Sequence, residues 1–90
     1  MIYLITYDIN SKFTDYNDLY DKIKSLGDWF HPLESVWLLH PNYKIDVNKI
    51  TYKLRETISD YDHIFVVEIT KSPKQGWLQK TAWEWLKKYE

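Results

Sequence analysis

The first ten residues, M-I-Y-L-I-T-Y-D-I-N, carry apolar side chains on both faces of an extended chain. The two faces hold Ile2, Leu4 and Thr6 on one side and Tyr3, Ile5 and Tyr7 on the other. A strand that is apolar on both faces is covered on both sides, so this pattern predicts a central strand. Asp8 stands where the apolar run stops, and Asn10 follows two residues later on the same side if the strand continues.

Apolar residues recur at helical spacing in two later segments. The expected N-caps are Thr14 or Asp15 for the first helix and Asp46 for the second, and Gly27 is the expected C-terminal glycine of the first. The predicted buried positions are Tyr16, Leu19, Tyr20, Ile23 and Leu26 in the first helix and Val47, Ile50, Leu54, Thr57 and Ile58 in the second. Both segments therefore predict amphipathic helices with one face on the core.

Three further segments have the composition of strands: residues 28–33, 34–40 and 63–70. Pro32 cannot donate to a strand ladder, so the first of them is predicted to be an edge strand that ends at His31. The first two lie so close in sequence that only a hairpin can join them. The third is rich in β-branched residues, which favour strands.

A polar connector, residues 71–76, separates these elements from a short helix with an aromatic face. This face must dock on its own domain or on a partner, and the expected interface residues are Trp77, Leu78, Trp83 and Trp85. Lysines lie between these aromatic residues, so two interpretations stay open. The helix either docks with a solvated lysine rim or offers a stacking surface for single-stranded nucleic acid.

The predicted order is strand, helix, strand, strand, helix, strand and a final helix, which is the βαββαβ plan of a ferredoxin-like α+β fold with a C-terminal helix. In this plan the first and third strands are central in a four-stranded antiparallel sheet, and two helices cover one face. Residues 1–70 form the predicted core, and residues 71–90 belong to the same domain or to a dimer interface. A homodimer, assisted by the C-terminal helix, is the simplest cover for the opposite face.

Composition narrows the function classes. Ninety residues suit one domain, and the net charge of −1 argues against strong, sequence-independent phosphate binding. The first 41 residues hold three lysines against six acids, so a nucleic-acid face would lie in the second half or across a dimer. Cysteine is absent, which excludes disulfides and thiolate metal sites. Without an apolar run near the roughly eighteen residues of a membrane span, a soluble cytoplasmic protein is expected.

Asp8 is the leading candidate for chemistry. A carboxylate at the end of a central strand could meet its symmetry mate in a dimer, and the pair could hold a Mg²⁺ that activates water on a phosphodiester. Asn10 and Ser35 are the expected substrate contacts, and Ser35 could donate a hydrogen bond to a phosphate. Asp8 could instead cap a turn or accept backbone N–H bonds. His31, His40 and His63 do not match a zinc spacing.

The motif Tyr-Asp-Ile-Asn at residues 7–10 and the motif Ser-Val-Trp at residues 35–37 resemble the small ferredoxin-like subunit of the CRISPR adaptation complex, a family of metal-dependent endonucleases. VapD-type interferase toxins share this plan, and the tail G-W-L and W-E-W-L is similar to that of short SinR-like relatives. The resemblance covers roughly residues 2–69. It implies that Asp8 binds metal as a pair across a homodimer and that Ser35 contacts a phosphate.

The family carries basic residues after its Tyr-Asp-Ile motif and along its first helix, where DNA backbone is held. This chain has Asp15, Asp18 and Asp21 there, which disfavours duplex DNA as a ligand. The sequence therefore supports two hypotheses. The first is a homodimeric relative of the adaptation subunit with Mg²⁺-dependent nuclease activity on RNA or DNA. The alternative is a non-catalytic interaction module that binds a protein partner or a small nucleotide.

Overall fold

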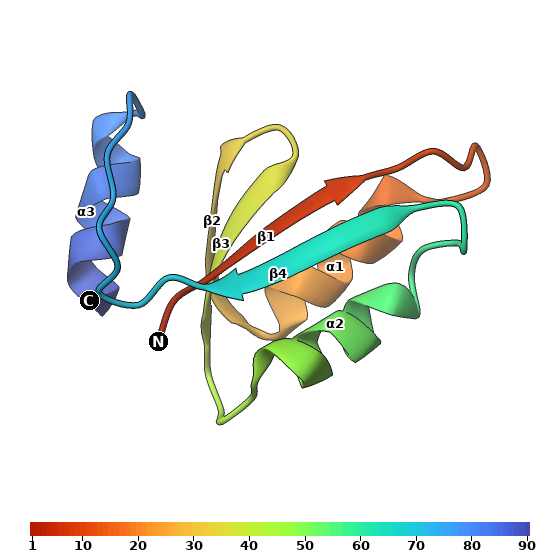
Figure 1. The fold of residues 1–90 in the computed structure, drawn as a ribbon, viewed down its shortest axis with the longest axis horizontal. Coiled ribbons are helices and arrows are strands. Elements are labelled where there is room, and N and C mark those ends of the chain that lie inside the picture. The colour runs from red at the N-terminus through yellow and green to blue at the C-terminus, as the bar shows by residue number, and fades with distance from the viewer.

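The computed structural model describes all residues from 1 to 90, and its elements follow the predicted order (Figure 1). A four-stranded antiparallel sheet carries three helices, none of which is long and apolar enough to cross a membrane. The elements are β1 (Tyr3–Asp8), α1 (Tyr16–Ser25), β2 (Gly27–Leu33), β3 (Val36–Pro41), α2 (Val47–Arg55), β4 (His63–Glu68) and α3 (Lys80–Tyr89).

The strand order in the sheet is β2-β3-β1-β4, so β1 and β3 are central, as predicted. In the register of the sheet, Leu4 of β1 lies opposite Leu38 of β3 and Val67 of β4, and Asp8 lies opposite His63. This order, with α1 and α2 as connections, confirms the α+β class and is that of a ferredoxin-like fold with a C-terminal helix.

The main core lies between the sheet and the two helices α1 and α2. Because side chains alternate along a strand, one face of β1 turns Tyr3, Ile5 and Tyr7 into this core. Its other buried members are Leu19, Ile23, Leu26, Trp37, Leu39, Ile45, Ile50 and Leu54. The helical spacing of the sequence thus selected the inner faces of both helices, but it was wrong for Tyr16, which lies in the first turn of α1 and is 47% exposed.

Both helix starts confirm the expected caps. The Asp15 carboxylate accepts a hydrogen bond from the Asn17 N–H at 2.8 Å, and the Asp46 carboxylate accepts one from the Lys49 N–H at 2.9 Å. Gly27 follows the C-cap of α1 and is also the first residue of β2. It is required by close approach, since a Cβ there would collide with the carbonyl oxygen of residue 40 and lie 2.7 Å from the backbone nitrogen of residue 42.

Strand boundaries differ from the prediction around the β2–β3 hairpin. The edge strand β2 does not end at His31 but continues to Leu33, across a register shift between Phe30 and Leu33. Pro32 lies within that shift, because a residue without an N–H cannot continue a regular ladder but can occupy an irregularity on an edge strand. The neighbouring strand β3 begins at Val36, two residues later than predicted.

Helix α3 lies apart from α1 and α2, against the opposite face of the sheet (Figure 1). Leu86 of α3 forms a small buried cluster with Ile2 and Leu38, against which Trp83 and Trp85 pack. The chain therefore covers one end of this face with its own helix, whereas the prediction placed a second copy there with the helix assisting. The rest of the face, around the end of β1, remains uncovered in the monomer, and we call it the open face.

Candidate functional site

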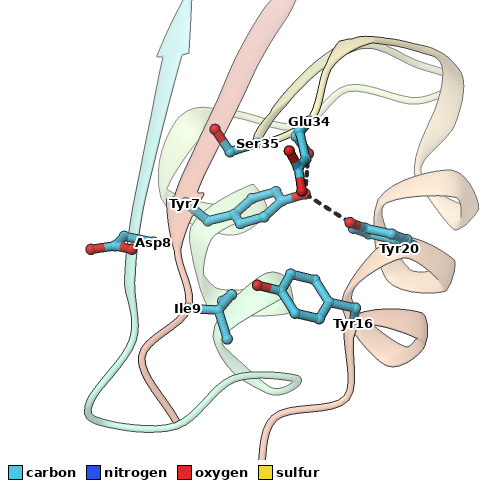
Figure 2. A pocket seen from close by; sticks show the side chains of 7 residues that line it. All are labelled: Tyr7, Asp8, Ile9, Tyr16, Tyr20, Glu34 and Ser35. Atoms are coloured by element: carbon cyan, nitrogen blue, oxygen red, sulfur yellow. Dashed lines mark hydrogen bonds between the residues drawn. The ribbon is translucent and has the colours of Figure 1, made fainter. Parts of the chain in front are cut away.

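The end of β1 separates two candidate surfaces. Tyr7 points toward α1, into a hollow of about 440 Å³, whereas the Asp8 side chain points away from it, onto the open face of the sheet (Figure 2). This division follows from the alternation of side chains along a strand. Tyr7 and Asp8, which are adjacent in the sequence, thus lie on opposite faces of the sheet.

Asp8 is exposed and lies opposite His63 in the ladder between β1 and β4. Its carboxylate makes none of the side-chain hydrogen bonds or ion pairs that hold other acids of the chain. It does not cap a turn and does not accept a backbone N–H. With His63 and Phe65 it borders a shallow hollow of about 250 Å³ on the open face. The carboxylate is therefore free to bind a ligand from outside.

A single chain does not assemble a metal site around Asp8. No group of three or more His, Cys, Asp or Glu side chains in the structure is arranged to hold a metal ion. Mg²⁺ is commonly bound by only one or two carboxylates, with water and substrate phosphates as its remaining ligands. Asp8 fits such a site chemically as a hard oxygen donor, and a second carboxylate would have to come from another molecule.

Asn10 and Ser35, the expected substrate contacts, lie in different places. The Asn10 side chain donates to the Tyr61 carbonyl oxygen at 3.0 Å, so it ties its loop to the segment before β4. Ser35 is exposed in the β2–β3 turn and lies at the rim of the hollow that contains Tyr7 (Figure 2). Of these two residues, Ser35 is the one whose polar side chain is free to bind a ligand, because the Asn10 side chain is already bonded to Tyr61.

Asp62 is a buried carboxylate whose importance was not evident from the sequence. It is 7% exposed, and its oxygens accept hydrogen bonds from Thr14 Oγ1 at 2.5 Å and from the Asn10 and Ser59 N–H groups at 2.7 and 2.9 Å. The Ser11 N–H and the Ser59 hydroxyl add two more. Asp62 thus joins the loop after β1 to the turn before β4.

These contacts set the charge state of Asp62. Burial by itself would raise the pKa of its carboxyl, but the hydrogen bonds from Thr14, Ser59, Ser11 and Asn10 favour the ionised form and hold the pKa well below its usual range. The group is therefore a permanently charged structural anchor, which fixes the loop that follows Asp8. No local pattern reveals this role, because Thr14 lies 48 residues away in sequence.

Tyr7 is the hydrogen-bond centre of the hollow on the helix side. Its hydroxyl lies 3.1 Å from the Glu34 carbonyl oxygen and 3.3 Å from the Tyr20 hydroxyl, and it accepts the Trp37 Nε1–H at 3.2 Å. The Glu34 carbonyl oxygen also accepts from His31 Nε2 at 2.8 Å. Burial raises the pKa of Tyr7, and its contact with Tyr20 raises it further, so the phenol stays neutral. These contacts fix the β2–β3 turn beside the hollow.

The expected interface residues of the C-terminal segment divide into packed and free side chains. Trp83 and Trp85 are half-buried against the sheet, and Leu78 lines an apolar groove of about 330 Å³ between α3, the connector and the open face. Trp77 is 99% exposed. At the other end of α3, the Tyr89 hydroxyl donates to the Asp28 carboxylate and joins the helix to β2.

Comparisons with protein-family models, with curated proteins and with solved structures find no match to this chain.

Proposed function

We propose that the chain is a homodimeric, Mg²⁺-dependent phosphodiesterase that acts on RNA or DNA, with the metal held between the Asp8 carboxylates of two copies. One observation carries this proposal: Asp8 is an exposed carboxylate without a hydrogen bond or ion pair, placed on the open face at the end of a central strand. The resemblance of residues 7–10 and 35–37 to the small subunit of the CRISPR adaptation complex supports it.

The open face supports association of two copies. Phe65 is 63% exposed there, and Val36 and Thr6, which lie opposite each other in the β1–β3 ladder, are only half-buried. An apolar sheet face of this kind is stabilised when a second sheet covers it. A two-fold axis that passes near the end of β1 would bring Asp8 and its mate toward one another. Two like charges at close range repel, and a divalent cation offsets that repulsion.

The bound Mg²⁺ would polarise a phosphoryl oxygen and lower the pKa of a water molecule. The residues of the chain have narrower roles. Asp8 would supply the anionic oxygens that hold the metal, and His63 lies opposite it in the ladder between β1 and β4. Ser35 offers a hydroxyl to a phosphate oxygen from the β2–β3 turn. In the reaction, the oxygen of water would form a bond to phosphorus and lose a proton to solvent, the phosphorus–oxygen bond of the nucleic-acid backbone would break, and the leaving oxygen would take up a proton from solvent.

Asp8→Asn tests the catalytic part of this proposal, with Asp21→Asn as the matched control on the exposed face of α1. Labelled RNA, single-stranded DNA and duplex DNA are incubated with each protein in Mg²⁺ and in EDTA. We expect cleavage by the parent protein in Mg²⁺ only, a loss of at least about a hundredfold in Asp8→Asn, because metal binding supplies several kcal/mol to the transition state, and near-parent activity in Asp21→Asn. Equal cleavage by the parent and Asp8→Asn would refute the catalytic role.

Phe65→Glu tests the dimer separately. A charge at this exposed position of the edge strand β4 should convert a dimer into a monomer in sedimentation velocity and abolish cleavage, whereas Asp8→Asn should remain dimeric. A parent protein that sediments as a monomer at tens of micromolar would remove the basis for the shared metal site.

The alternative function keeps the fold without catalysis, as an interaction module that binds a protein partner or a small nucleotide. The 99% exposure of Trp77 favours it, because a free indole is a ready stacking or docking group. Titration with nucleoside triphosphates should quench the tryptophan emission of the parent protein more than that of Trp77→Phe. Unchanged emission in both proteins would count against nucleotide binding by this residue.

A further inference from the structure

The hollow on the helix side of β1 combines three aromatic rings with one acidic side chain. Tyr7, Tyr16 and Tyr20 line it together with Glu34, whereas the Asp8 side chain points away from these residues (Figure 2). Its remaining lining residues are neutral, so no lysine, arginine or histidine lines it. A volume of about 440 Å³ is large enough for a small organic ligand.

The three tyrosine rings form a triangle. Their centroids are 6.4 Å apart for Tyr7 and Tyr16, 6.4 Å for Tyr7 and Tyr20, and 5.8 Å for Tyr16 and Tyr20, with interplanar angles between 49° and 60°. The three centroids lie close enough together for one cation to be within the roughly 6 Å range of cation–π attraction of each ring. Tyr16 is 47% exposed, which leaves the triangle accessible from solvent.

The lysines of the chain do not already occupy these rings. The cation–π contacts of the structure place Lys24 over Trp29 and Trp37, and they place Lys12 and Lys88 over their own neighbours in sequence. No lysine of the chain therefore lies over the triangle of tyrosines, and His31 meets Tyr20 only edge-on, with 5.5 Å between the ring centroids. A cationic partner for the triangle must come from another molecule.

Charge around the hollow selects the same kind of ligand. Glu34 is exposed at its rim, and no basic side chain in the lining offsets its charge. Such an acidic surface attracts cations and repels phosphate groups. A nucleotide would have to bring its phosphates beside the Glu34 carboxylate, whereas an alkylammonium group would be attracted by both the rings and this carboxylate.

We infer that the hollow formed by Tyr7, Tyr16, Tyr20 and Glu34 is a binding site for an alkylammonium group, above all a methylated one. The group belongs to a free amine or to a methylated lysine side chain, which share this chemistry. The site lies on the other side of β1 from the Asp8 carboxylate and does not depend on the proposed nuclease activity.

The test compares choline with dimethylbutanol, its neutral isostere, by ligand-observed NMR in the presence of EDTA. The two probes have the same shape and differ in charge. We expect choline to bind with a millimolar or lower dissociation constant and at least about tenfold tighter than the isostere, because three rings act together. Equal binding of the two probes, or no binding of choline, would overturn the inference.

Variants localise the binding. Tyr16→Leu removes the most exposed ring and should weaken choline binding about two- to fivefold, and Glu34→Gln should weaken it while leaving binding of the isostere unchanged. Tyr52→Leu is the matched control, since Tyr52 is 71% exposed on α2, outside the hollow. Choline binding that is the same in Tyr16→Leu and the parent protein would also overturn the inference.

A neutral peptide carrying trimethyllysine distinguishes the two sources of the cation. Tighter binding of this peptide than of choline, with sensitivity to Tyr16→Leu, assigns the group to a protein partner. Binding no tighter than that of choline assigns it to a free amine.

Discussion

Tyr7→Phe removes one hydroxyl from the centre of the structure without changing the shape of the ring. In the parent protein that hydroxyl accepts the Trp37 Nε1–H at 3.2 Å and lies 3.1 Å from the Glu34 carbonyl oxygen. Trp37 is 1% exposed, so in the variant its N–H has neither a protein acceptor nor ready access to water. The Glu34 carbonyl oxygen keeps its bond from His31 Nε2.

The expected cost follows from the unpaired donor. A buried polar group left without its hydrogen bond costs about 1–3 kcal/mol, and we expect Tyr7→Phe to lower the free energy of unfolding by that amount. For a domain of this size, each kcal/mol lowers the melting temperature by about 4–8 °C. Urea unfolding followed by tryptophan emission and circular dichroism measures the change. Tyr52→Phe, which alters an exposed hydroxyl, is the control and should stay within about 0.5 kcal/mol of the parent.

Alkaline pH gives a second readout of the same group. Burial raises the pKa of Tyr7 in the folded state above the ordinary tyrosine value near 10. The stability contributed by the neutral phenol is therefore complete below about pH 10 and is lost as the pH rises beyond it, because only the unfolded chain ionises there. The difference in stability between the parent and Tyr7→Phe should narrow above pH 10. The assigned role of the hydroxyl would be refuted if Tyr7→Phe were as stable as the parent protein at neutral pH and if the difference between their free energies of unfolding did not change with pH.

Two further perturbations test other parts of the fold. Asp62→Asn should accelerate amide exchange in the loops on both sides of residue 62. Because the pKa of Asp62 is lower in the folded state than in the unfolded chain, the ionised carboxylate stabilises the fold at pH values above the ordinary pKa near 4. This stabilisation is lost as the pH falls below that value. Denaturant midpoints at pH 7 and pH 3 should therefore differ more in the parent than in the variant. Leu86→Ala should destabilise the protein by about 2–5 kcal/mol through the cavity it leaves beside Ile2 and Leu38, and hydrogen exchange should show α3 released first. Uniform exchange across α3 and the sheet in that variant would show that the helix is not a separable unit.

Local patterns in the sequence determined the elements and their faces. The alternation from Ile2 to Tyr7 predicted a central strand apolar on both sides, and it also placed Tyr7 and Asp8 on opposite faces. Asp15 and Asp46 were recognisable as N-caps because a cap bonds to an N–H two or three residues away. Strand ends were less accurate around Pro32, because the irregular pairing of β2 depends on β3 as well as on its own residues.

The tertiary structure decided everything that depends on residues far apart in the chain. Asp62 anchors Thr14, and Tyr7 meets Trp37 and Glu34, over separations of 27 to 48 residues, which no local period encodes. The same is true of α3: its aromatic face was evident in the sequence, but only the fold showed that Leu86 covers the far end of the sheet and leaves Asp8 uncovered. Hydrophobic period selects which side of an element is buried, whereas the sheet register and helix packing select which side chains meet.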